Sequence, residues 1–118
     1  MRVNSKPDVN FVNQPAKMKI KGIKYKFTAK PWQYSGPGGG WHFVSLPVEL
    51  AKKIRNALKS EEEAWGRLKA TAKIGNSEWS TAIWFDTKRN TYLLPLKSEI
   101  RKKENLSGDK VVETVLWI

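Results

Sequence analysis

The side chains that most often carry out catalysis are sparse in this sequence. His42 is the single histidine, and there is no cysteine. A histidine acting as general base needs an orienting partner, and a zinc site needs three or four ligands. Neither arrangement is visible, since Glu61, Glu62 and Glu63 are adjacent and the other acids lie near predicted turns or helix starts. We therefore expect no enzymatic activity, no metal and no cofactor.

The glycine-rich segment SGPGGG at residues 35–40 invites comparison with phosphate-binding loops. Such a loop requires a Lys-Ser/Thr pair after its glycines and a helix that follows. Here Trp41 and a strand-like segment follow instead. The segment is therefore interpreted as a flexible connection between two strands.

Basic residues give the chain a net charge of +11, and residues 1–30 account for +7 of it. This asymmetry indicates an anionic partner, with DNA or RNA first. The alternative is that a basic tail and solvated strand faces only keep the protein in solution. If the two lysine-rich strands are neighbours, the predicted nucleic-acid-binding residues are Lys24, Lys26, Lys30, Arg67, Lys69 and Lys73.

The six tryptophans are the other unusual feature. Most should lie in the core, because a small barrel needs bulky side chains. Trp32 and Trp41 flank the glycine segment and could instead form a stacking platform for single-stranded nucleic acid, or line a ligand pocket at the barrel mouth. The alternative is that both rings close the barrel end.

The elements that must position these residues are mostly strands. Alternation of apolar and polar residues predicts strands at about 24–30 and 67–74, and aromatic or β-branched runs predict four more at about 41–46, 79–83, 91–94 and 111–117. Pro31 should end the first strand or lie on an edge. Leu50, Ile54 and Leu58 recur at helical spacing after Pro47, and Leu96 and Ile100 indicate a second short helix.

The predicted domain organisation is simple. Residues 1–20 are polar and without periodicity, and we interpret them as a basic, mostly irregular tail, followed by a β-barrel domain over residues 21–118. No apolar run is long enough for a membrane helix, and the N-terminus lacks the apolar region of a signal peptide. The expected location is the cytoplasm.

Two stretches follow one plan of strand, Leu-Pro, helix and strand, beginning at Leu46-Pro47 and Leu94-Pro95. Leu58 and Leu106 lie at the same distance from each proline, and the two helices should be of similar length. This repetition predicts a β-barrel of about six strands with two short helices and a pseudo-two-fold axis. A chain that contains both halves is expected to be a monomer.

The second copy, with Glu99-Ile100-Arg101 and residues 106–111 (LSGDKV), resembles the swapped-hairpin element of AbrB-like and MazE-like DNA-binding proteins. From about Tyr25 onward the chain resembles a bacterial family of unknown function with a double-split β-barrel, whose relatives are fused to YdeI/OmpD-associated bacteriocin-resistance segments. The residues that support this resemblance are Phe27, Gly39-Gly40-Trp41, Phe43-Val44, Leu46-Pro47, residues 72–75, Trp79-Ser80-Thr81, residues 94–97, Arg101-Lys102 and Gly108-Asp109. The resemblance implies a fold and no established activity.

The sequence thus indicates a small binding module. The favoured partner is nucleic acid, bound electrostatically through a basic face. The alternative is a small molecule or peptide in a tryptophan-lined pocket that includes Trp32 and Trp41.

Overall fold

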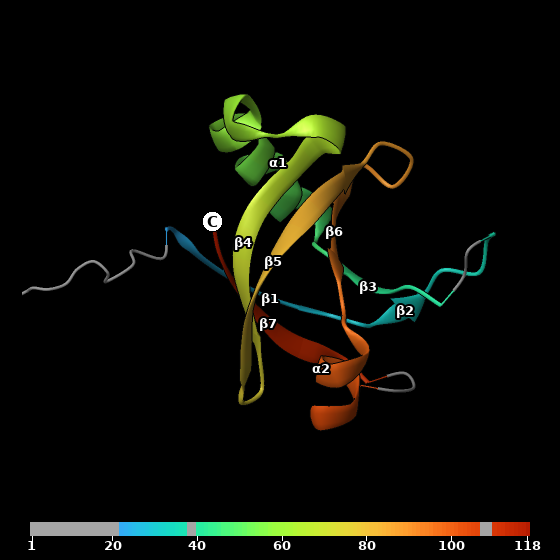
Figure 1. The fold of residues 1–118 in the computed structure, drawn as a ribbon. Coiled ribbons are helices and arrows are strands. Elements are labelled where there is room, and N and C mark those ends of the chain that lie inside the picture. The colour runs from blue at the N-terminus through green and yellow to red at the C-terminus, as the bar shows by residue number, and fades with distance from the viewer. Residues whose placement is uncertain (1–21, 38–39, 107–109) are drawn as a thin grey trace, which may run out of the picture.

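The computed structural model describes residues 22–37, 40–106 and 110–118, which form a mainly β fold with two α-helices (Figure 1). The predicted tail, residues 1–20, lies outside the described residues. One antiparallel sheet has the strand order β1-β7-β4-β5-β6-β3-β2 and curls into a half-barrel. Its strands are β1 (Lys24–Ala29), β2 (Trp32–Gln33), β3 (His42–Ser45), β4 (Arg67–Ile74), β5 (Ser77–Asp86), β6 (Thr91–Pro95) and β7 (Val112–Trp117).

The sheet has seven strands rather than the predicted six, because the first predicted strand continues beyond a break. Pro31 has no N–H to donate to a ladder, and the chain leaves β7 after Ala29. It rejoins the sheet at the opposite edge, where Trp32 is in register with Phe43 of β3. The segment from β1 to β2 therefore connects the two edges of the curled sheet.

Alternation along the strands separates an inner, core-forming face from an outer face. On β4 the four apolar residues of the alternating segment, Leu68, Ala70, Ala72 and Ile74, are all buried. Val44, Tyr92 and Leu94 extend this core across β3 and β6, and all three are completely buried. The residues between them in sequence point to the outer face.

The two helices lie at the ends of the half-barrel and differ in length, contrary to the prediction. Helix α1 (Val48–Leu58) has 11 residues, whereas α2 (Ser98–Lys103) has 6. Helical spacing places Leu50, Ile54 and Leu58 on one face of α1, and of these Ile54 is buried while Leu50 and Leu58 are only partly buried against the core; on α2, Ile100 is buried. The longer α1 continues through the 3₁₀ turns η1 (Lys59–Glu61) and η2 (Ala64–Gly66) before β4.

A polar network fastens the segment after α1 to the sheet. The hydroxyl of buried Tyr92 donates a hydrogen bond to Glu62, and Arg55 lies 3.8 Å from the same carboxylate. The Arg55 guanidinium also lies 3.7 Å from the centre of the Phe85 ring. Burial, followed by the hydrogen bond to Glu62, raises the pKa of Tyr92 well above its ordinary value. The Tyr92 hydroxyl therefore stays protonated and continues to donate its hydrogen bond to Glu62.

Candidate aromatic groove

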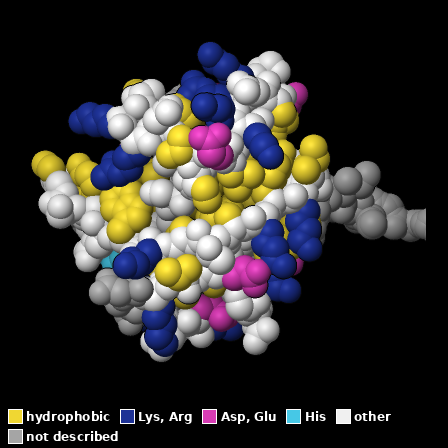
Figure 2. All heavy atoms as spheres, turned by 180° about the vertical axis from the view of Figure 1, so that it is seen from behind, with side chains coloured by type: hydrophobic (Ala, Val, Ile, Leu, Met, Phe, Trp, Pro, Cys, Tyr) yellow, Lys and Arg dark blue, Asp and Glu magenta, His cyan; other side chains and the backbone are white. Residues whose placement is uncertain are grey.

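A groove of about 450 Å³ lies on the outer face of the sheet, where β2, β3, β5 and β6 meet. We call it the aromatic groove, and its lining residues are Trp32, Tyr34, Trp41, Phe43, Trp65, Trp84, Asp86, Arg89 and Leu93. Phe43, Trp84 and Leu93 alternate with core residues along their strands, which is why these side chains point away from the core. In Figure 2, hydrophobic side chains gather on the side where β2 and β3 lie, with Lys and Arg side chains around them.

Two tryptophans of the groove are unusually exposed. Trp41 is 54% exposed and stacks on Phe43, with ring centres 6.1 Å apart and planes 8° apart. Trp65 is 88% exposed. Phe43 also contacts Trp32, with ring centres 5.2 Å apart. Trp32, Phe43 and Trp41 therefore form a connected aromatic surface, and the Trp41 ring remains partly in solvent.

Trp65 adopts a backbone conformation that bulky residues rarely take. Its φ is 67°, in the left-handed region, and the following Gly66 has φ 64°. Such a conformation in a large residue costs free energy, and it is found disproportionately at binding sites. The turn directs the chain from η2 into β4. Sequence reasoning missed Trp65, because it lies in a non-periodic segment with no signal beyond its residue type.

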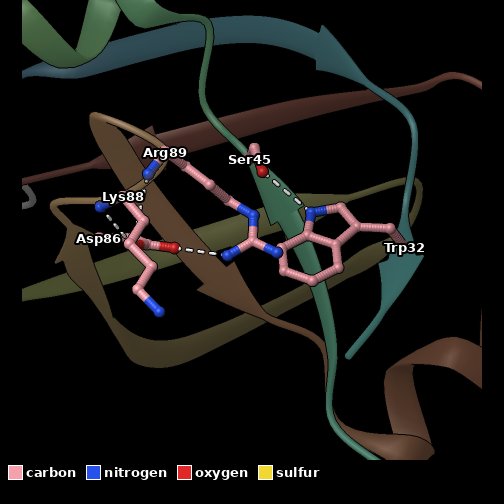
Figure 3. A network of polar contacts seen from close by, with 5 residues as sticks. All are labelled: Trp32, Ser45, Asp86, Lys88 and Arg89. Carbon is pink, nitrogen blue, oxygen red and sulfur yellow. Dashed lines mark hydrogen bonds and ion pairs between the residues drawn. The ribbon is translucent and has the colours of Figure 1, made fainter. Parts of the chain in front are cut away.

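Trp32 is held in place by two polar contacts (Figure 3). Its indole N–H donates to Ser45 Oγ at 2.9 Å, and the Arg89 guanidinium lies 4.3 Å from its ring centre. Arg89 in turn donates to Asp86 Oδ2 at 2.7 Å, and the backbone N–H of Lys88 donates to Asp86 Oδ1 at 2.9 Å. These contacts hold the guanidinium over the indole ring.

The Asp86 carboxylate stays ionised because its hydrogen bonds outweigh its burial. Burial raises its pKa, but hydrogen bonds from the Arg89 side chain and from the backbone N–H groups of Lys88 and Arg89 lower it further, so that the net pKa lies below the ordinary 3.8. The groove thus combines apolar rings with one fixed Arg–Asp pair at its rim. This arrangement suits stacking and polar recognition.

The predicted residues Trp32 and Trp41 both line the groove, but the groove is not at a barrel mouth. It lies on the outer face of the sheet, since β2 pairs with β3 at an open edge and turns Trp32 away from the core. Trp84, which sequence reasoning did not single out, joins them because β5 pairs with β6 and sets it opposite Leu93.

The predicted basic residues are distributed over two strands that are not direct neighbours. Strand β7 lies between β1 and β4, so Lys26 and Lys73 are each in register with Val115. Lys24, Lys26 and Lys73 line one shallow hollow of about 530 Å³. Acids accompany the bases, since Lys26 lies 3.4 Å from Glu113 and Lys69 lies 3.8 Å from Glu63.

Arg67 pairs with Glu63 as well, and Lys30 is exposed at the break after β1. Over residues 22–37, 40–106 and 110–118, no group of three or more His, Asp or Glu side chains could hold a metal ion. In the same ranges, no helix is long and apolar enough to cross a membrane.

Comparison with known proteins identifies a family but no function. The family model described as "Domain of unknown function (DUF1905)" matches residues 27–116, which cover all seven strands in part or whole. No curated protein matches the chain significantly.

Proposed function

The chain belongs to this family of unknown function, DUF1905, and we propose that it is a binding protein whose aromatic groove holds a small organic ligand with a planar ring. The supporting observation is the convergence of Trp32, Trp41, Trp65 and Trp84, from separate parts of the chain, on one groove. Exposed rings bind planar ligands through stacking, at roughly 0.5–1.5 kcal/mol per ring pair beyond area burial. Binding rather than catalysis is proposed because the groove contains no histidine, and Asp86 is its single carboxylate among the described residues.

The size of the groove favours a small molecule over a peptide. Its volume of about 450 Å³ falls in the range of roughly 300–1,000 Å³ typical of small-molecule sites. If the groove bound a peptide but no small aromatic compound, the peptide would be identified as its occupant instead.

Nuclear magnetic resonance of the indole N–H groups tests this proposal. Planar compounds such as naphthalene derivatives are compared with saturated compounds of the same size. We expect the planar series to shift the signals of Trp41 and Trp65 and to leave Trp79 unchanged, since Trp79 is a core residue. Equal responses to planar and saturated compounds, or no response, would contradict the proposal.

Nucleic-acid binding through the basic outer face is the second candidate. It is supported by the net charge of +11 and by the hollow that Lys24, Lys26 and Lys73 share. The acids Glu63 and Glu113 weaken it, because they offset part of this charge. Titration with duplex and single-stranded DNA and RNA at increasing salt is the test, and no retention at about 50 mM salt would exclude it.

For the architecture we propose the double-split barrel with a pseudo-two-fold axis. The pairing of β3 with β6 and of β4 with β7 supports it, because each pair joins equivalent strands of the two Leu-Pro units. The unequal helices limit the repeat to the strands. We also propose a monomer, and sedimentation that shows a strand-exchanged dimer would contradict this.

A further inference from the structure

A second pocket lies beside β2 and has a different character from the aromatic groove. Its volume is about 480 Å³. We call it the cationic pocket, and it is lined by Pro31, Trp32, Gln33, His42, Arg101, Lys102, Asn105 and Leu106. The lining combines β2, the start of β3, and the last turn of α2 with the residues that follow it. Residues that are some 60 positions apart in sequence thus meet at one site.

A short chain of hydrogen bonds holds His42 and Arg101 in position. The Leu96 N–H donates to the His42 carbonyl at 2.8 Å, and Arg101 Nε donates to the Leu96 carbonyl at 3.3 Å. The His42 ring is oriented by a bond of 3.1 Å between Nδ1 and the Gly40 carbonyl. Because a carbonyl only accepts, Nδ1 donates the proton of this bond, which fixes the orientation of the ring beside the pocket.

Among the described residues, no carboxylate compensates the charge of this pocket. None of the described acidic residues lines it, and neither Arg101 nor Lys102 has a carboxylate partner within residues 22–37, 40–106 and 110–118. Several basic residues elsewhere are paired, among them Lys26, Arg67 and Arg89. The bond to Leu96 uses one N–H of Arg101 and leaves its two terminal amino groups for other acceptors.

We propose that the cationic pocket binds the phosphate group of a small molecule. The Arg101 guanidinium suits two phosphate oxygens at once, and the Lys102 ammonium adds a point charge. Gln33 and Asn105 contribute amide N–H donors to the same lining. Trp32 lines both sites, but the cationic pocket includes neither Trp41 nor Trp65, and its charged residues are outside the aromatic groove. The phosphate proposal therefore does not depend on a ring-binding function.

The single histidine makes the test specific. His42 imidazole signals in nuclear magnetic resonance are assigned without ambiguity, since there is no other histidine. At constant pH and ionic strength, inorganic phosphate and glycerol 3-phosphate are titrated in parallel, with chloride as the control. We expect saturable shifts with both phosphates and none with chloride. Tighter binding of the ester would identify a phosphorylated metabolite as the ligand, and tighter binding of inorganic phosphate would identify the free ion.

Matched variants separate this pocket from general attraction of anions. Arg101→Gln and Lys102→Gln should each weaken phosphate binding about tenfold, as expected for loss of one charge-assisted hydrogen bond. Lys53→Gln removes the same charge from an exposed position of α1, which lies outside the pocket, and should leave affinity unchanged. Equal losses in all three variants would overturn the proposal. If one variant failed to fold, the wild-type titration would still test it, because shifts that do not saturate would overturn it as well.

Discussion

The outer face of the sheet has two halves that use the same strand alternation to opposite effect. Around β2, β3 and the end of β5, the outward positions hold aromatic rings, and Trp41 and Trp65 stay exposed. Around β1, β7 and β4, the outward positions hold bases, and neighbouring acids such as Glu113 offset them. The lysine half is therefore partly neutralised within the fold, whereas the aromatic half retains an unsatisfied apolar surface.

This difference shows how poorly counts of residue types predict surfaces. The net charge of +11 suggests a strongly basic face, but Glu63 comes close enough to contact both Arg67 and Lys69. The tryptophans appear scattered along the chain, but the fold gathers four of them around one groove. The aromatic groove is thus the stronger candidate site, although it is assembled from distant segments and could not be read from local sequence.

The largest effect is expected on the free energy of unfolding. It tests whether the aromatic half and the lysine half of the sheet rest on one shared core. Ile54→Ala should lower the free energy of unfolding by about 2–5 kcal/mol, because Ile54 is completely buried between α1 and the sheet. Urea unfolding followed by tryptophan fluorescence should give a single transition for both halves. A loss below about 0.5 kcal/mol would mean that α1 contributes little to the core.

The next effect concerns the lysine half. Reversing Lys24, Lys26 and Lys30 to Glu should lower affinity for polyanions by about 100-fold at low salt and make the salt dependence shallower by up to about 0.9 per lost phosphate contact. Reversal of Lys52, Lys53 and Lys59, all exposed on α1 or just after it, makes the same charge change elsewhere. Equal losses in the two triple variants would show that only net charge matters.

A smaller effect is expected in the aromatic half, where one substitution should separate binding from stability. Trp65→Gly should weaken binding of a planar ligand by roughly three- to tenfold, as one stacking surface is lost. It should also raise stability by up to about 1 kcal/mol, because glycine adopts a φ of 67° without strain. Trp41→Ala is the comparison, with a similar loss of binding and no gain in stability. Unchanged ligand binding in both would remove the groove as a site.

The smallest effect concerns the Asp86–Arg89 pair at the groove. Because folding lowers the pKa of Asp86 below its ordinary 3.8, this carboxylate stabilises the fold above about pH 4, and its contribution is lost as pH falls through the lower, folded-state pKa. Asp86→Asn should flatten this part of the stability curve and cost about 1 kcal/mol at neutral pH. If the melting temperature of the Asp86→Asn variant fell with decreasing pH in the same way as that of the wild type, the Asp86–Arg89 pair would not be coupled to folding.

Local pattern was sufficient for most of the secondary structure. The alternation at residues 67–74 and the helical spacing of Leu50, Ile54 and Leu58 placed a strand and a helix where the structure has them. These periods follow from backbone geometry and need only neighbours in sequence. The same reasoning failed for β2, because a two-residue strand has no period. It also failed for the extent of α2, because the helix begins at Ser98 and therefore contains Ile100 but not Leu96.

The candidate sites depended on pairing between distant segments. The sequence by itself determined which side chains point away from the core, among them Lys24, Lys26 and Lys73, and it drew attention to Trp32 and Trp41. Only the tertiary structure decided that β7 separates the lysine strands, that Trp65 and Trp84 join the other rings, and that Arg101 meets His42. The physical reason is that alternation is set by the local backbone, whereas strand order and register are set by how the whole chain buries its core.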